Sequence, residues 1–149
     1  MAEISRKELV LSLMQAGTSP RLAGVDLSAL DMTRLSLEGA NLRGANMKVA
    51  TCRETILRST NMTGVDATTA QMPFADFFGS TLLGVNFTAA NLQGVRLENA
   101  NLQNAVLNAA NLLNANMKGA NVNGVKFDEN TTWPDGKKGS QSNPANYTN

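Results

Sequence analysis

An apolar residue recurs at every fifth position over most of this chain, and no other feature of the sequence constrains the fold as strongly. The series begins at Leu27 and ends at Phe127, and all 21 members are apolar. At the chain's hydrophobic content of 42%, such a run would arise by chance roughly once in 10^8. We call this the central position. It is occupied by Leu27, Met32, Leu37, Leu42, Met47, Cys52, Leu57, Met62, Ala67, Met72, Phe77, Leu82, Phe87, Leu92, Leu97, Leu102, Leu107, Leu112, Met117, Val122 and Phe127.

The neighbours of the central position are also regular. Position −2 holds Ala, Val or Leu in 18 of the 21 pentads, position −1 is mostly polar with many Asn and Asp, and position +2 is rich in Gly and Asn. A period of five fits neither a helix nor a single strand, whose periods are about 3.6 and 2. We expect each pentad to form a short extended side followed by a corner, with the residues at +2 and −1 taking the unusual corner angles. One side cannot bury its apolar face alone, so the sides must wind into coils that stack.

Several pentads carry a recognisable motif. Ala-Asn-Leu-Arg-Gly (40–44), Ala-Asn-Leu-Gln-Gly (90–94), Ala-Asn-Leu-Gln-Asn (100–104) and Ala-Asn-Met-Lys-Gly (115–119) resemble the A(D/N)LXX motif of pentapeptide repeat proteins. The resemblance implies an all-β solenoid, a right-handed quadrilateral β-helix with four pentads per coil. Residues 20 apart would then stack, and 21 pentads would give about five coils and a rod of roughly 25 Å. The chain is similar to the stand-alone members of the family from cyanobacteria.

Before the repeats, the sequence predicts a short helix over residues 5–16 that lies on the first coil. Ser5 and Glu8 have the spacing of a capping box, and Gly17 is a suitable stop. A secretory signal is the alternative, but its apolar stretch would be short and its flank acidic. The predicted apolar face of the helix consists of Leu9, Val10, Leu13 and Met14.

After Glu129 the five-residue pattern ends. We expect Trp133 to pack on the last coil near Phe127, and residues 137–149, which lack apolar periodicity, to form a mobile tail. The sequence therefore divides into an N-terminal capping helix with its lead-in (1–24), a pentapeptide repeat β-helix (25–129), and a C-terminal cap with a flexible tail (130–149).

The composition argues against an enzyme. The chain has no histidine and a single cysteine, Cys52, which occupies a central position and is therefore expected to be buried and inert. No acidic cluster has metal-loop spacing and no glycine-rich loop cradles a phosphate, so we assign no catalytic, cofactor-binding or metal residue. No apolar run reaches the ~20 residues of a membrane helix, and the expected location is cytoplasmic.

Two groups of residues expected on the surface are unusual in composition, one apolar and one basic. Phe74, Phe78 and Leu83 occupy positions expected to face outward, which suggests a contact with a partner protein. The alternative is a local bulge that tucks one of the phenylalanine rings against the coil. A candidate basic patch, or simply a solvated face, consists of Arg34, Arg43, Lys48, Arg53 and Arg58.

Together these features predict a non-catalytic interaction scaffold that presents flat β-helix faces to an as yet unknown protein partner. We expect no small-molecule substrate and no membrane contact, and either a monomer or a weak end-to-end dimer. The alternative comes from the resemblance, since some members of the family mimic DNA, bind DNA gyrase and confer quinolone resistance. A 25 Å stretch of B-DNA would carry about 15 negative charges. Residues 25–129 hold nine acidic and eight basic side chains, a net charge of −1, which disfavours both mimicry and nucleic-acid binding.

Overall fold

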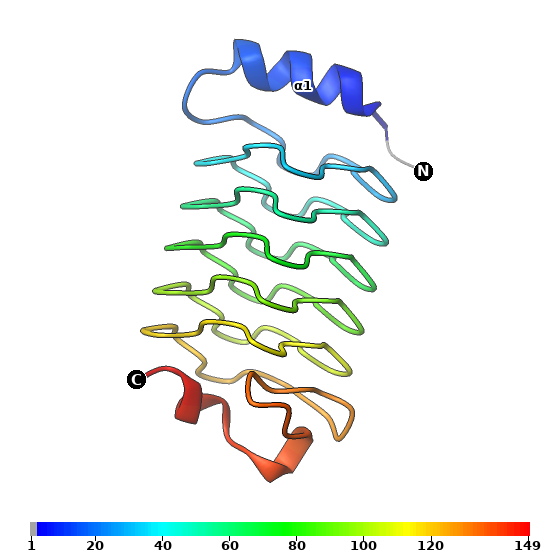
Figure 1. Cartoon of the computed structure of the whole chain (residues 1–149). Coiled ribbons are helices and arrows are strands. Elements are labelled where there is room, and N and C mark those ends of the chain that lie inside the picture. The colour runs from blue at the N-terminus through cyan, green and yellow to red at the C-terminus, as the bar shows by residue number, and fades with distance from the viewer. Residues whose placement is uncertain (1–2) are drawn as a thin grey trace.

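The computed structural model describes residues 3–149 and shows a stack of flat coils with a helix lying across one end (Figure 1). The helices are α1 (Arg6–Gln15), and two short 3-10 helices at the other end, η1 (Gly139–Gln141) and η2 (Pro144–Tyr147). Among the described residues no strand exceeds a single bridged residue. The coils are joined instead by isolated parallel bridges, from Arg21↔Asn41 to Val106↔Lys126, each linking residues 20 apart. The chain is therefore a solenoid with four pentads per coil, and the expected stacking is confirmed.

Each pentad from Ala40 to Asn104 uses three of its five backbone amides to stack the coils. In Ala40–Gly44, the amides of Leu42 and Gly44 donate to the following coil at 2.8 and 2.9 Å, and the amide of Asn41 donates to the preceding coil at 2.8 Å. A fourth amide, that of the next pentad's first residue, Ala45, closes the corner by donating to the Leu42 carbonyl at 2.9 Å. The fifth amide, that of Arg43, makes no backbone hydrogen bond in the described part of the chain and therefore needs a partner of another kind.

The Asn or Asp at position −1 provides that partner. Its side-chain oxygen accepts a hydrogen bond from the backbone amide two residues later, as Asn41 does from Arg43 at 3.2 Å. In the pentads that carry Asn or Asp, this local bond fixes the start of the corner. Within the described repeats, no residue at position −1 has a positive φ, so the expectation that this position takes unusual backbone angles is wrong. The acceptors are Asp26, Asp31, Asn41, Asn46, Asn61, Asp66, Asp76, Asn86, Asn91, Asn101, Asn111, Asn116 and Asn121.

The unusual angles lie at position +2 alone within the repeats. Every +2 residue from Gly24 to Gly124 has a positive φ, between 53° and 71°. Nine of them are glycine and twelve are not, although a non-glycine residue in this conformation costs roughly 1–2 kcal/mol. The corner geometry is thus imposed by the stacked ladder, not by glycine alone.

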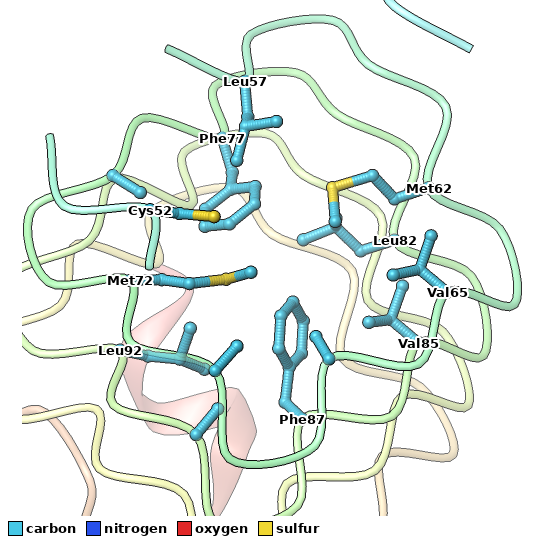
Figure 2. Packing of buried hydrophobic residues seen from close by; sticks show 14 of the residues in the cluster. Cys52, Leu57, Met62, Val65, Met72, Phe77, Leu82, Val85, Phe87 and Leu92 are labelled. Carbon is cyan, nitrogen blue, oxygen red and sulfur yellow. The ribbon is translucent and has the colours of Figure 1, made fainter. Parts of the chain in front are cut away.

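The central residues form the core, as predicted. All of them from Leu27 to Met117 are at most 1% exposed, whereas Val122 and Phe127 in the last coil are only partly buried. Phe77 and Phe87 point into the interior from different sides (Figure 2), with ring centroids 6.1 Å apart in an edge-to-face arrangement. This geometry is favourable for aromatic pairs.

At the N-terminal end, α1 begins with the predicted capping box. Ser5 Oγ accepts from the Glu8 amide at 3.2 Å and the Glu8 carboxylate accepts from the Ser5 amide at 2.6 Å. Leu9 is fully buried and Leu13 packs against the core. The placement of Met14 on this apolar face is wrong, since its side chain is 77% exposed. Five residues after Leu9 at ~100° per residue, Met14 points about 140° away from it, whereas Leu13 shares the same stripe.

At the C-terminal end, the coil continues beyond the point where the repeat pattern stops. Asn111 bridges to Thr132, 21 residues later, so one extra residue has been inserted. Thr131 and Trp133 then fill positions −2 and central, both with no exposed surface. The chain next reverses, and Thr132 pairs with Lys138 in an antiparallel bridge. The expectation that the pattern ends after Glu129 is therefore corrected: the frame shifts by one residue and resumes.

The predicted mobile tail over 137–149 instead folds back on the last coil. The Tyr147 ring stacks on Trp133 with centroids 5.9 Å apart, and its hydroxyl donates to the Asp135 carboxylate at 2.8 Å. The indole Nε1 of Trp133 donates to the Gly139 carbonyl at 2.7 Å. Pro144 is also buried. A few large contacts anchor this segment, although its composition shows no apolar period.

Candidate interaction surface

The structure separates the three residues that were predicted to form a partner contact. Phe74, Phe78 and Leu83 occupy three successive corners of one coil. Phe74 and Phe78 flank the same side and are 52% and 39% exposed. Leu83 lies at the corner opposite Phe74 and is partly buried. The structure therefore brings together two of the three residues, and neither phenylalanine is tucked away.

The side between Phe74 and Phe78 continues into the neighbouring coils. Residues 54–58, 74–78 and 94–98 stack on one another through the parallel bridges of Asp76 with Ile56 and Arg96. We call this surface the Asp76 side. Its outward residues are Glu54, Ile56 and Arg58 in the first stretch, Phe74, Asp76 and Phe78 in the second, and Gly94, Arg96 and Glu98 in the third.

Asp76 organises the charges of this side. Its Oδ2 atom accepts from Arg58 Nε at 2.6 Å and from Arg96 Nη1 at 3.0 Å, while Oδ1 accepts from the Phe78 amide at 3.1 Å. The Asp76 side chain is only 13% exposed. Arg96 also binds Glu98 at 2.9 Å, and this hydrogen bond together with the charge of Asp76 raises the pKa of Arg96. The two guanidinium groups are therefore held in fixed positions.

The two aromatic rings are each contacted by a residue of the next coil. A Cβ atom built on Gly94 would lie 2.5 Å from carbons of the Phe74 ring, so the ring rests directly on the glycine backbone. Phe78 lies beneath the Arg96 guanidinium, whose carbon is 5.8 Å from the ring centroid, within reach of a cation–π interaction. Each ring thus has a defined orientation and still presents an open face.

The predicted basic patch does not form one surface. Arg34 and Arg53 meet at Glu54, at 2.8 and 3.1 Å, and this contact lowers the pKa of Glu54, mainly through the hydrogen bond from Arg34. Arg58 binds Asp76, as described above. The remaining two lie at other corners: Lys48 pairs with Asp66 at 3.2 Å, and Arg43 makes no ion pair within residues 3–149. Four of the five cations are thus paired locally with a carboxylate, and two of them share Glu54.

Three observations concern thiol reactivity, metal binding and membrane-spanning helices. Burial raises the pKa of the Cys52 thiol to about 12, so the thiolate needed for nucleophilic attack is not formed near neutral pH. Within the described part of the chain, no three His, Cys, Asp or Glu side chains are grouped so as to hold a metal ion. No helix among residues 3–149 has both the length and the apolar character required to span a bilayer. The cytoplasmic location remains a prediction.

Asp76, Arg96, Ile56 and Gly94 complete this side, and none was singled out from the sequence. The 20-residue stacking distance could have grouped Ile56, Asp76 and Arg96 as one column. The salt bridges could not have been deduced, because they depend on side-chain conformations across two coils.

Comparison with known families gives a consistent match. The family model described as pentapeptide repeats matches the chain in eight copies, over residues 20–48 and 90–128. These residues belong to the same stacked pentads that form the coils. A search of curated proteins finds no significant match to the chain.

Among solved structures, the chain is similar to the pentapeptide repeat protein Rfr23 from the cyanobacterium Cyanothece 51142, with 24% identity over 84% of this chain and 99% of that one, and a TM-score of 0.41. It is similar to AT2G44920, a pentapeptide repeat protein from the Arabidopsis thaliana thylakoid lumen, with 30% identity over 71% and 68% of the two chains and a TM-score of 0.39. For full-length QnrB1, a plasmid-mediated fluoroquinolone resistance protein, the identity is 14% over 87% and 76%, with a TM-score of 0.37.

Proposed function

The chain belongs to the pentapeptide repeat family, and from that premise we propose that it is a non-catalytic scaffold that binds a partner protein through the Asp76 side. The scaffold is a right-handed quadrilateral β-helix of about five coils, the form that the family resemblance implies. A solenoid of this kind offers flat walls on which outward residues vary without disturbing the core.

One observation carries the proposal: two exposed aromatic rings flank a set of ordered arginine–carboxylate pairs on a single side. Aromatic and arginine side chains are enriched among the residues that dominate binding energy. The rings of Phe74 and Phe78 are held by Gly94 and Arg96, so they lose little conformational freedom when a partner binds. Preorganisation of this kind lowers the cost of association.

Two further observations support a scaffold over the other function classes. Cys52 is buried with a raised pKa, and the chain contains no histidine, which removes the commonest nucleophile–base arrangements. Acidic residues such as Asp76 and Glu54 are paired with arginine, so they do not present the uniform negative charge of a DNA mimic. The gyrase-binding alternative is therefore not favoured.

The experiment is an affinity capture with three immobilised proteins: the wild type, a Phe74→Ser/Phe78→Ser double variant, and a Val49→Ser control. Val49 is 58% exposed and lies at another corner with φ 59°, close to the 60° of Phe74, so its replacement matches the backbone context. Proteins enriched from an extract of the source organism are quantified by mass spectrometry, and circular dichroism checks the fold of each variant.

We expect at least one protein to be enriched by the wild type and the Val49→Ser control and lost from the double variant. In a binding assay with that purified protein, the double variant should weaken affinity by more than about tenfold, as the loss of a binding hot spot does. If all three baits retain the same proteins, the Asp76 side is not the binding surface. If a fourth bait, Leu83→Ser, loses the captured protein while the double variant retains it, the contact lies on a different side.

A further inference from the structure

The last coil leaves much of its backbone edge open. Within residues 3–149, the amides of Val122, Gly124 and Phe127 have no hydrogen-bond acceptor, and the carbonyls of Ala120 and Val125 have no donor. The stretch one coil earlier, residues 100–107, makes all five of these bonds, at distances of 2.7 to 2.9 Å. We call Ala120–Phe127 the open edge.

The adjacent side of the same coil shows what such an edge accepts. There the edge is filled by the chain's own segment Thr131–Pro134. The Leu112 amide donates to the Thr132 carbonyl at 2.8 Å, and the Thr132 amide donates to the Ala110 carbonyl at 2.9 Å. This occupant is extended and runs parallel to the coil. Between this filled stretch and the open edge, the Met117 amide has no acceptor within residues 3–149, and the Gly119 amide donates to the Thr148 carbonyl at 2.7 Å.

A hollow runs beneath the open edge. Val122, Val125 and Phe127 form one wall, and Ser142, Pro144 and Asn146 form the other. The three apolar side chains are only partly buried, unlike the central residues of the earlier coils. Apolar contacts and unpaired backbone groups therefore meet in one groove.

We propose that the open edge binds one extended peptide segment of a partner protein, which adds to the last coil as a parallel strand. The segment would donate two amides, to the carbonyls of Ala120 and Val125, and would accept from the amides of Val122, Gly124 and Phe127. It would direct aliphatic side chains against Val122 and Phe127 and would carry no proline at its two donating positions. This is recognition by strand addition, and it uses a surface separate from the Asp76 side.

The shape of this end favours a slim segment over a second copy of the chain. Residues 131–149, with η1 and η2, extend past the last coil at this end of the stack (Figure 1). A second flat coil would meet this segment before its own backbone reached the open edge. A single extended peptide is narrower than a coil and would need only the hollow lined by Val122, Phe127 and Pro144.

The test uses the full chain, labelled with ¹⁵N, and a synthetic peptide with the sequence of residues 99–108. In the chain, this sequence forms the same type of ladder, with Asn101 and Val106 donating to the preceding coil. The control peptide carries proline in place of both of these residues, which removes the two donated hydrogen bonds. Chemical shifts and amide exchange rates are followed residue by residue.

We expect the first peptide to shift the amide signals of Val122, Gly124 and Phe127 and to slow their exchange at least tenfold at saturation, while the control peptide leaves them unchanged. A Val122→Asp variant should lose this response while retaining the amide spectrum of residues 25–100. The Phe74→Ser/Phe78→Ser variant should bind the peptide as the wild type does, so failure here is distinguishable from failure of the Asp76 side.

Two results overturn the proposal. One is the absence of any response at the open edge with millimolar peptide. The other is protection that already exists without peptide, grows with protein concentration and coincides with a dimer in light scattering, because the occupant would then be a second copy.

Discussion

The two ends of the rod meet the same physical demand in different ways. A stacked solenoid exposes unpaired backbone groups where it starts and where it stops. At the N-terminal end, the Arg6 guanidinium donates to the carbonyls of Asp31 and Thr33 at 2.6 and 2.9 Å, and Leu9 of α1 covers the core. At the C-terminal end, the segment Thr131–Pro134 fills one side and leaves Ala120–Phe127 open. A helix laid across a coil shields it with side chains, whereas a folded-back strand closes only the side it reaches.

This difference predicts that the C-terminal closure depends on one residue. Trp133 is fully buried, packs edge-to-face on Phe127, stacks on Tyr147 and binds the Gly139 carbonyl. Trp133→Ala should lower the free energy of unfolding by about 3–5 kcal/mol, measured by urea denaturation. Tyr147→Phe, which removes only a hydroxyl, is the matched control and should cost far less. Equal effects of the two substitutions would show that the indole does not anchor this end.

The N-terminal cap should depend on Leu9 to a somewhat smaller degree. Leu9→Ala removes a fully buried side chain between α1 and the first coil, and should cost about 2–5 kcal/mol in the same assay. Leu11→Ala, at a site 48% exposed on the same helix, controls for the change in helix propensity. If both substitutions have the same small effect, α1 does not cover the core.

The capping box gives a smaller change at the same end. Ser5→Ala removes the side-chain acceptor of the Glu8 amide and should cost about 0.5–2 kcal/mol. Protease cleavage within residues 6–15 should become faster, while cleavage near Trp133 should not change. Faster cleavage at both ends would mean that the two closures are coupled.

The smallest expected effect is a change in how acid lowers the melting temperature, and it comes from Asp135 at the C-terminal end. Hydrogen bonds from Lys137 and Tyr147 lower the pKa of Asp135 to about 2. A carboxyl group with a lowered pKa stabilises the fold above its unfolded pKa, near 4, and this contribution is lost as the pH falls toward 2. Melting temperatures between pH 5 and 2 should therefore fall less steeply for Asp135→Asn than for the wild type. Identical slopes would show that Asp135 plays no part in acid sensitivity.

The sequence predicted the interior of the rod better than its last turn. A constant interval of five places residues such as Leu42 and Phe87 in the core without reference to distant contacts. The interval from Phe127 to Trp133 is six. A five-residue period therefore no longer identifies the buried position after the inserted residue. The tail was predicted to be mobile because its apolar residues show no period. Tyr147 and Pro144 anchor it through isolated contacts, which periodicity does not reveal.

The candidate surface was predicted only in part. The outward positions of Phe74 and Phe78 follow from the repeat, and the structure confirms that both are exposed. Leu83 was grouped with them because it is near in sequence, although a quarter turn at each corner places it across the coil from Phe74. The pairing of Asp76 with two arginines depends on side-chain geometry that periodicity does not describe.

Amide hydrogen exchange, measured residue by residue on the full chain, tests most directly whether the backbone ladder is complete in the interior coils and broken at the open edge. The amides of interior residues such as Leu42, Leu82 and Leu102 should exchange slowly, near the rate of global unfolding, because each donates to the following coil. Those of Val122, Gly124 and Phe127 should exchange orders of magnitude faster. Equal protection of the two groups, or fast exchange in both, would contradict the structure described above.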